Sequence, residues 1–264
     1  MLVRWMRGLL AGGLAAGIAV SGCDSQVAGQ ATAAPEGAPL TSGPTPGSAS
    51  PGPATPAPTA SGDRRGPRAS AGPCRYAETA ATLANPANKD VGLPPDPDPT
   101  PATRTQAVTF TTNRGAIVVT LDRAQAPCAV QSFLFLVGKR FFDNTPCPRV
   151  ASRRPDGLGI LQCGDPTGGT AGGPTYQYRE ENLAGADYRT GVVAMANAGP
   201  GTTGSQFFFL HEDAPDLPKN YSVVGRVTAG LAVVTAVAAG GHDGSSPAGG
   251  GRPTLPITIT GTQT

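Results

Sequence analysis

The hydrophobic positions of this 264-residue chain first form a regular pattern near Ala107. Apolar and polar residues alternate over Val108–Thr112, and Ala116–Leu121 is a second apolar segment, so both are predicted strands with a hairpin turn at Asn113–Gly115. Further along, apolar residues recur at i, i+3, i+4 and i+7, which predicts a helix from Pro127 to Gly138. The region therefore begins with a hairpin and a helix.

More short apolar segments follow along the same region. We predict strands over Cys147–Ala151, Leu158–Cys163, Val192–Ala196, Phe207–Leu210, Tyr221–Val227 and Leu255–Thr260, and a second helix over Leu231–Ala239. Many short strands with only two helices favour a closed antiparallel barrel capped by helices over a parallel sheet with alternating strands and helices. We therefore expect residues 104–264 to form one all-β domain.

The first residues have the features of an export signal. Arg4 and Arg7 precede an uncharged apolar run, Gly8–Val20, which is shorter than the roughly 20 residues of a membrane-spanning helix. The run ends in VSGC, which resembles the lipobox of bacterial lipoproteins, where the cysteine becomes the lipidated first residue. The resemblance implies a signal peptide over residues 1–22 and an exported, extracytoplasmic protein anchored to the cell membrane through Cys23. An ordinary secretory signal and a buried helix are the alternatives.

Residues 23–103 are predicted to form a tether between this anchor and the domain. Ala31–Ala60 contains eight prolines and a single charged residue, Glu36, so it has no apolar face to bury. Pro73–Thr103 is also rich in proline, but it contains Cys74 and Tyr76. This last strip is either pinned onto the domain or further linker, and its composition does not separate the two.

Charge and histidine content exclude several classes of function. The formal net charge is +2 and 14% of residues are charged, so no basic surface indicates nucleic-acid binding. His211 and His242 lie far apart and outside any Cys/His spacing of a zinc site. We expect neither a metal nor a cofactor.

Two loops of the predicted domain are rich in small residues. MANAGPGTTGSQFF, beginning at Met195, is similar to the signature of the cyclophilins, a family of peptidyl-prolyl cis-trans isomerases, and LQCGDPTGGTAGG, beginning at Leu161, is similar to the family's QGGDxTxxxGxGG loop. The resemblance extends over about Val108–Thr262. It implies a closed eight-stranded barrel with a helix at each mouth, and isomerisation of X-Pro peptide bonds.

Isomerisation of an X-Pro bond needs neither a nucleophile nor a metal. The barrier of roughly 18–20 kcal/mol comes from amide resonance. A desolvated slot for proline and a hydrogen-bond donor aimed at the prolyl nitrogen lower this barrier if they bind the twisted state best. Arg149 matches by position the arginine that cyclophilins use as this donor, and a guanidinium is always charged and rigid. The alternative is a surface arginine beside Arg153 and Arg154.

The resemblance also implies roles for other residues. Gln162 would orient the arginine, Asn197 would offer backbone groups to the residue before proline, and Tyr221 replaces a histidine of other members. Ile160, Phe208 and Leu217 would form the proline pocket, and Ala196, Thr202 and Gln206 would edge the groove. The chain departs from the family pattern at Pro148, Gly159 and Asp216, which replace a histidine, a phenylalanine and a tryptophan. We therefore expect an activity that is weaker or differently selective.

Four cysteines remain after Cys23, and an even number in an exported chain indicates disulfides. Four cysteines can form two disulfides in three different ways, and the alternative is that all four thiols are reduced. Cys147 and Cys163 lie on strands expected to be neighbours, so we take them first, which leaves Cys74 with Cys128.

The sequence thus favours a monomeric isomerase that assists the folding of exported proteins at the outer face of the cell membrane. Its partners would be proline-containing peptides and unfolded exported proteins, with the membrane contacted through the lipid. The alternative is a proline-binding chaperone or scaffold with little or no turnover.

Overall fold

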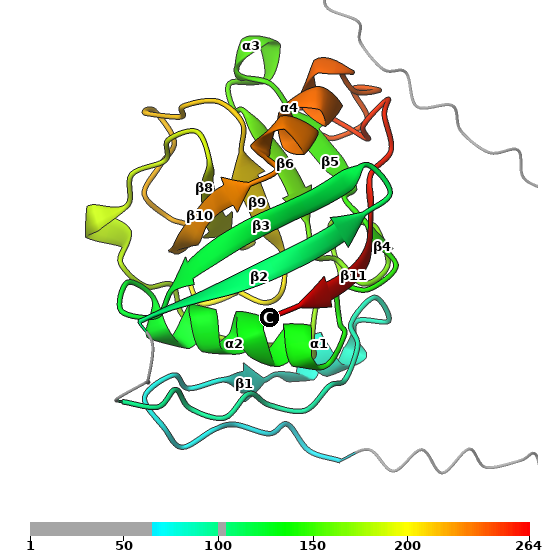
Figure 1. Ribbon diagram of the computed structural model, residues 1–264. Coiled ribbons are helices and arrows are strands. Elements are labelled where there is room, and N and C mark those ends of the chain that lie inside the picture. Colours follow the sequence, from blue (N-terminus) through cyan, green and yellow to red (C-terminus); the bar gives the residue numbers. More distant parts are fainter. Residues whose placement is uncertain (1–64, 100–103) are drawn as a thin grey trace, which may run out of the picture. The chain divides into compact units, whose positions relative to one another are not determined.

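The computed structural model describes residues 65–99 and 104–264. The predicted signal peptide, Cys23 and the proline-rich Ala31–Ala60 lie outside the described residues. A curled antiparallel sheet of nine strands forms the body of the domain (Figure 1), in the order β4-β11-β2-β3-β10-β8-β9-β6-β5. Its strands are β2 (Thr105–Thr112), β3 (Gly115–Asp122), β4 (Thr145–Pro146), β5 (Arg149–Ala151), β6 (Ile160–Cys163), β8 (Val192–Met195), β9 (Phe207–Leu210), β10 (Val223–Ala229) and β11 (Thr258–Gln263).

The two long helices lie at opposite ends of the curled sheet (Figure 1). They are α2 (Pro127–Gly138) and α4 (Leu231–Ala239), and both have the predicted bounds. Glu181 caps α2, because its carboxylate accepts hydrogen bonds from the backbone N–H groups of Cys128 (3.2 Å) and Ala129 (2.8 Å). Shorter helical turns are α1 (Ala80–Ala84), α3 (Arg153–Asp156) and a 3₁₀ turn at Leu183–Gly185. Across the described residues, the helices are too short or too polar to cross a membrane.

The expectation of a closed eight-stranded barrel needs correction. The sheet has nine strands, and its edge strands β4 and β5 do not pair with each other. They follow each other in the chain, separated only by Cys147 and Pro148. Pro148 has no N–H to donate to a ladder, so the segment breaks there: β4 pairs with β11, and β5 pairs with β6. The sheet therefore curls into a half-barrel that no continuous ladder closes.

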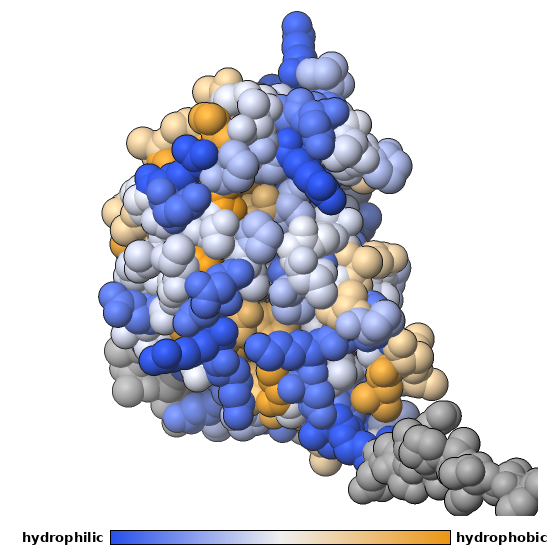
Figure 2. All heavy atoms as spheres, turned by 90° about the vertical axis from the view of Figure 1, so that its right-hand side faces the viewer, coloured by the Kyte–Doolittle hydropathy of each residue, from blue (hydrophilic) through white to orange (hydrophobic). Residues whose placement is uncertain are grey.

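Aromatic side chains fill the core inside the sheet. Phe110, Phe133, Phe142 and Phe207 are fully buried, with ring centroids between 5.1 Å and 6.4 Å apart. Successive residues of β9 point to opposite faces, so Phe207 and Phe209 enter this core while Phe208 joins a second apolar cluster. Outside, the face in Figure 2 shows only small, separated hydrophobic areas among hydrophilic ones.

Residues 65–99, which we call the strap, are pinned onto the domain rather than forming further linker. Their short strand β1 (Ala77–Glu78), labelled below α2 in Figure 1, pairs with β7 (Tyr176–Gln177). A disulfide joins Cys74 to Cys128 at the start of α2, and the other joins Cys147 to Cys163. The Tyr76 side chain is fully buried, and its hydroxyl donates to the Cys128 carbonyl at 2.7 Å. Of the three pairings open to the sequence, the structure has the one considered first.

A buried carboxylate makes a second attachment of the strap. The Glu78 side chain has no exposed surface and accepts hydrogen bonds from Arg65 and Arg68 of the strap. It also accepts from the Thr175 hydroxyl of the domain at 2.7 Å. Although burial alone would raise the pKa of the Glu78 carboxyl, these hydrogen bonds hold that pKa well below its usual range. The ion pairs of Glu78 thus order the strap itself, and the Thr175 hydrogen bond attaches the buried carboxylate to the domain.

Candidate functional site

Strand register brings the two polar residues of the site together. Arg149 on β5 lies directly opposite Gln162 on β6, and Gln162 lies opposite Phe208 on β9. Directly opposed residues project to the same face of a sheet, so these three side chains are neighbours. The Cys147–Cys163 disulfide joins the same two segments beside this row.

Arg149 is held by the chain on three sides. Its Nη1 donates to Gln162 Oε1 (3.0 Å), its Nε to the Gly249 carbonyl (2.8 Å) and its Nη2 to the Ala248 carbonyl (2.6 Å). The residue is 8% exposed, and this burial lowers the pKa of the guanidinium, which remains charged because its ordinary pKa is so high. A guanidinium has five N–H groups, so one on each terminal nitrogen remains for a ligand.

A relay of amides fixes Gln162 in turn. Gln162 Nε2 donates to Gln206 Oε1 at 2.7 Å, and Gln206 Nε2 donates to the Gly172 carbonyl at 2.8 Å. Because each amide uses its oxygen as acceptor and its nitrogen as donor, the orientation of both side chains is determined. The predicted residues Gln162 and Gln206 are thus connected in a single row that ends at Arg149.

Beside Arg149 the surface is hollowed by an apolar notch. Ile160, Phe208 and Leu217 line this cavity of about 280 Å³, together with Tyr221. The Phe208 and Tyr221 rings meet edge to face, with centroids 5.4 Å apart. Tyr221 is itself held, since its carbonyl accepts from the Tyr188 hydroxyl at 2.9 Å. Arg149 and Gln162 form the polar side of the same cavity.

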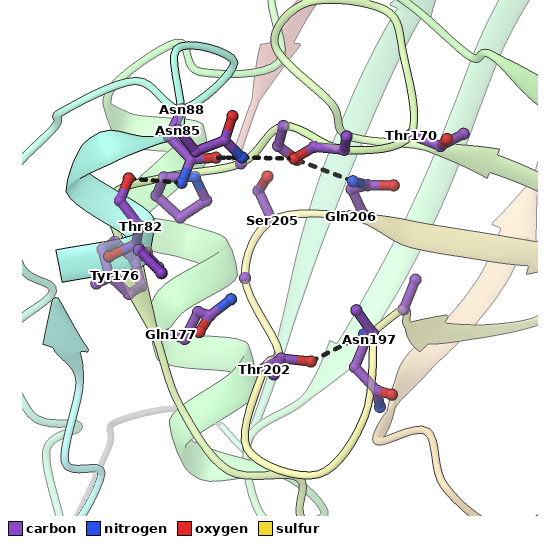
Figure 3. A pocket seen from close by; sticks show the side chains of 18 of the residues that line it. Thr82, Asn85, Asn88, Thr170, Tyr176, Gln177, Asn197, Thr202, Ser205 and Gln206 are labelled. Atoms are coloured by element: carbon purple, nitrogen blue, oxygen red, sulfur yellow. Dashed lines mark hydrogen bonds between the residues drawn. The ribbon is translucent and has the colours of Figure 1, made fainter. Parts of the chain in front are cut away.

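The remaining predicted residues lie at a second cavity next to the notch, shown in Figure 3. It measures about 430 Å³, and Thr202 and Gln206 line it. Gln162, Ala196 and Asn197 line both cavities. The ten residues singled out in the sequence are therefore all brought to one continuous groove. Among the residues described, no three His, Cys, Asp or Glu side chains converge as metal ligands would.

The segment that builds the groove matches a known family. Residues 107–264 match the family described as "Cyclophilin type peptidyl-prolyl cis-trans isomerase/CLD", which is more than half of the chain. The chain belongs to this family. Arg149, Gln162 and the whole apolar notch lie inside the matched residues. The strap lies before them, so it is an addition to the cyclophilin domain.

Two mycobacterial relatives carry the name "Probable peptidyl-prolyl cis-trans isomerase B". The Mycobacterium leprae protein is 36% identical over 201 residues, which cover 70% of this chain and 64% of the relative. The Mycobacterium tuberculosis H37Rv protein is 38% identical over 167 residues, which cover 58% of this chain and 53% of the relative. The chain therefore spans between about half and two thirds of the length of these relatives.

A solved cyclophilin has the same fold. It is a crystal structure of a Cryptosporidium parvum cyclophilin type peptidyl-prolyl cis-trans isomerase in the presence of the dipeptide Ala-Pro. The TM-score is 0.52 at 29% identity, and the match covers 60% of this chain and 97% of that chain. The likeness supports the all-β cyclophilin fold of the domain.

The structure also shows which parts of the cyclophilin groove the sequence did not reveal. Leu158 lines the notch beside Gly159, the position where a family phenylalanine is missing. A Cβ on Gly159 would lie 2.5 Å from Glu212 Cβ, so no larger residue fits there, and Leu158 supplies the apolar wall from the neighbouring position. The only sign of this role in the sequence was that Leu158 directly precedes Gly159, the position at which the family has a phenylalanine.

A loop after α4 forms another part that was missed. Ser246, Pro247 and Ala248 line the notch, and Ala248 and Gly249 supply the carbonyls that hold Arg149. Thr170 lines both cavities and was also not singled out. The loop is rich in glycine and has no apolar periodicity, so no pattern pointed to its contact with β5.

Proposed function

We propose that this protein is a peptidyl-prolyl cis-trans isomerase that acts on X-Pro bonds of exported proteins at the outer face of the cell membrane. One observation carries the proposal: a buried, charged guanidinium with two uncommitted N–H groups lies beside an apolar notch. Membership of the cyclophilin family supports it. So does the crystal structure of a family member in the presence of Ala-Pro.

The groove would act by binding the twisted peptide better than either planar form. The proline ring would occupy the notch of Ile160, Phe208 and Leu217 and would displace water from it. An N–H of Arg149 would then donate to the prolyl nitrogen, whose lone pair becomes available only when the amide loses its conjugation. Gln162 would hold the guanidinium at the angle that this bond requires, because it accepts from Nη1.

The rest of the groove would hold the peptide on either side of the bond. Asn197 would offer backbone groups to the residue before proline, and its own side chain is fixed by a 2.7 Å hydrogen bond to the Asn220 carbonyl. Ala196, Thr202 and Gln206 would form the edge along which the peptide lies. An extended peptide in such a groove is recognised through its backbone and a few pockets, which suits many different clients.

The test is a protease-coupled isomerisation assay on a proline tetrapeptide. We expect Arg149→Ala to lower kcat/KM by about 100-fold or more, as loss of a donor to the transition state does. Arg153→Ala is the matched control, because Arg153 is an exposed arginine on the segment that follows β5. Equal rates for Arg149→Ala and the unaltered protein would refute the assignment.

The membrane location rests on Cys23 and the VSGC sequence before it. A single acyl chain binds membranes only reversibly, so a diacylglyceryl group is the expected anchor. Intact-mass analysis of protein extracted from membranes should show this adduct, and Cys23→Ser should release the protein. An unmodified Cys23 in the membrane fraction would contradict the anchor and leave the isomerase proposal untouched.

A second candidate is a proline-binding chaperone with little or no turnover. The observation in its favour is that three N–H groups of Arg149 are already committed to acceptors of the chain itself. Refolding of a client limited by proline isomerisation separates the two functions, because only an isomerase shortens a slow phase of about 10–100 s. A client that is held soluble while its slow phase is unchanged would favour the chaperone.

A further inference from the structure

The catalytic arginine does not itself titrate near neutral pH, but the loop that holds it contains a histidine. A guanidinium stays charged at all ordinary pH values. The chain has two histidines, His211 and His242, and imidazoles commonly change their charge between about pH 5 and 8. His242 lies in the loop over residues 241–252, whose backbone carbonyls accept hydrogen bonds from Arg149.

Both ring nitrogens of His242 make hydrogen bonds, and these bonds determine its tautomer. Nδ1 accepts from the backbone N–H of Gly244 at 3.1 Å, so Nδ1 carries no hydrogen. Nε2 therefore carries the hydrogen of the neutral ring and donates it to Asp156 Oδ2 at 2.9 Å. The hydrogen bonds of the structure are consequently those of a neutral imidazole.

Asp156 remains a carboxylate while a histidine titrates. Burial alone would raise the pKa of the Asp156 carboxyl, but hydrogen bonds from the Ser152 and Gly250 N–H groups and from His242 hold that pKa below its usual range. A negative charge therefore faces Nε2 whether the imidazole is neutral or protonated. Its protonation changes the hydrogen bond at Nδ1.

The other charged residues on the elements around His242 are Arg149 of β5, Arg153 and Arg154 of α3, and Asp243 and Arg252 of the loop itself, whereas α4 has none. Arg153 and Arg154 are exposed, and the Asp243 carboxylate accepts from the Arg252 N–H at 2.8 Å. Asp156 is thus the group that compensates a positive charge on the imidazole.

The hydrogen bond at Nδ1 is coupled to β5 by close backbone packing. Gly244 lies against Gly251, where an added Cβ would be 2.7 Å from the Gly244 nitrogen. Gly251 exchanges two backbone hydrogen bonds with Val150, the neighbour of Arg149 on β5. A movement of Gly244 therefore displaces the loop that supplies the acceptors of Arg149.

Protonation would place a hydrogen on Nδ1, facing the Gly244 N–H. Two N–H groups repel each other, so this hydrogen bond would break while Asp156 retains the cation. We propose that His242 is a positioning residue that fixes the acceptors of Arg149 only when its imidazole is neutral, so that turnover falls as the pH drops from about 8 to about 5. This inference rests on the proposed function.

The test follows the exchange of a proline peptide between its cis and trans forms by NMR, at saturating peptide and at several pH values between about 5 and 8. The peptide has no group that titrates in this range, and no protease is needed. For the unaltered protein we expect kcat to fall about threefold to tenfold toward the acid end, as loss of one net hydrogen bond provides. KM should change little, because the notch itself is unaltered.

Two glutamine substitutions provide the matched comparison. His242→Gln keeps a donor for Asp156 but has no acceptor for Gly244 and does not titrate, so its kcat should stay at the low, acid value at every pH. His211→Gln is the control, because His211 Nε2 lies 2.9 Å from the Ala151 carbonyl and glutamine keeps a donor there. This control should retain the pH profile of the unaltered protein.

A second measurement does not require turnover. The Arg149 Nε–H group donates to the Gly249 carbonyl at 2.8 Å, and its NMR signal reports on that hydrogen bond. We expect the signal to shift with pH in the unaltered protein and in His211→Gln, but not in His242→Gln.

The outcomes separate this inference from the proposed function. A flat kcat profile, or the same profile for His242→Gln as for the unaltered protein, overturns the role of His242 while Arg149-dependent turnover stands. A pH-dependent Arg149 signal that is lost in His242→Gln, without turnover in any variant, would instead support the pH-dependent hold on Arg149 and overturn the isomerase.

Discussion

Arg149 shows how residue-level contacts set the chemistry of the groove. An arginine at an exposed position would spread its charge over many conformers, but here two backbone carbonyls and one amide oxygen determine the plane of the guanidinium. The bonds also satisfy a buried charge, whose desolvation would otherwise be costly. The two N–H groups that remain are pre-oriented, so none of the binding energy of a peptide is spent on ordering the arginine.

Gly159 provides a stability prediction at the same scale. We expect Gly159→Ala to lower the free energy of unfolding by about 1–3 kcal/mol, because the new methyl would lie 2.5 Å from Glu212 Cβ and 3.2 Å from its backbone nitrogen. Neither atom is the free end of a flexible side chain. Urea unfolding measures the change.

Gly138→Ala is the control for Gly159→Ala. Gly138 ends α2 and has no atom within 4 Å of an added Cβ, so alanine should be neutral or stabilising by up to about 1 kcal/mol. Equal stabilities of the two variants would show that the domain absorbs a methyl at Gly159 without strain.

At the scale of elements, the loop over residues 241–252 acts as a clamp on β5. Gly251 exchanges two backbone hydrogen bonds with Val150, at 2.8 Å and 2.9 Å. A Cβ on Gly250 would lie 2.1 Å from the Val150 carbonyl oxygen, so only glycine allows this approach. Asp156 ties the loop to α3 through His242 Nε2 at 2.9 Å. The loop thereby brings its carbonyls to Arg149.

The clamp predicts a loss of activity on a change outside the groove. Asp156→Ala removes the acceptor for His242 and for the Ser152 N–H, so the loop that carries the Arg149 acceptors should shift. We expect kcat to fall about 10-fold to 100-fold with little change in KM, since a small misplacement of a catalytic group has such an effect. Steady-state kinetics and circular dichroism check the rate and the fold. Unchanged kcat in a folded variant would show that Arg149 does not need the clamp.

The strap predicts a pH-dependent contribution to stability. The pKa of Glu78 is depressed in the folded protein, so its carboxylate stabilises the fold above the unfolded pKa of about 4.3, and this contribution falls as the pH drops below that value. We therefore expect Glu78→Gln to be less stable than the unaltered protein at pH 7, with a difference that shrinks between about pH 4 and pH 3. Urea unfolding at a series of pH values measures it.

Asp187→Asn serves as the control for the Glu78 measurement. Asp187 is exposed and, within residues 65–99 and 104–264, pairs only with the exposed Arg189, and surface pairs contribute little to stability. Its unfolding curves should therefore follow those of the unaltered protein. A Glu78→Gln difference that stays constant from pH 7 to pH 3 would contradict the charged network.

For the whole molecule, periodicity predicted both long helices and every strand of the sheet except the edge strand β4, but not the parts that depend on irregular contacts. The last strand begins at Thr258 rather than at Leu255, because Pro256 has no N–H for a ladder. Docking of the strap depends on buried Tyr76 and Glu78, which lie singly in a polar, proline-rich stretch where no period can reveal them. The ten groove residues came from the family resemblance, six of them from its two motifs and four by position, whereas the resemblance assigned no role to Leu158 or the clamp loop.

The two disulfides should separate stability from activity across the molecule. Cys74 and Cys128 are 54 residues apart and Cys147 and Cys163 are 16 apart, so closing the loops stabilises the fold by about 4 and about 3 kcal/mol, respectively. Replacing each pair by serine and measuring urea unfolding should give losses in that order.

The loss of activity should be larger for the Cys147–Cys163 disulfide than for the Cys74–Cys128 disulfide, which is the opposite of the order for stability. Without Cys74–Cys128 the strap is still held by Glu78 and by the pairing of β1 with β7, so kcat/KM on a short Ala-Pro peptide should be unchanged. The Cys147–Cys163 bond joins β6 to the residues just before β5, and these two strands place Arg149 opposite Gln162, so its loss should lower kcat/KM. If both serine pairs lowered kcat/KM equally, the strap as well as strand register would position the catalytic arginine, and the predicted independence of activity from Cys74–Cys128 would be wrong.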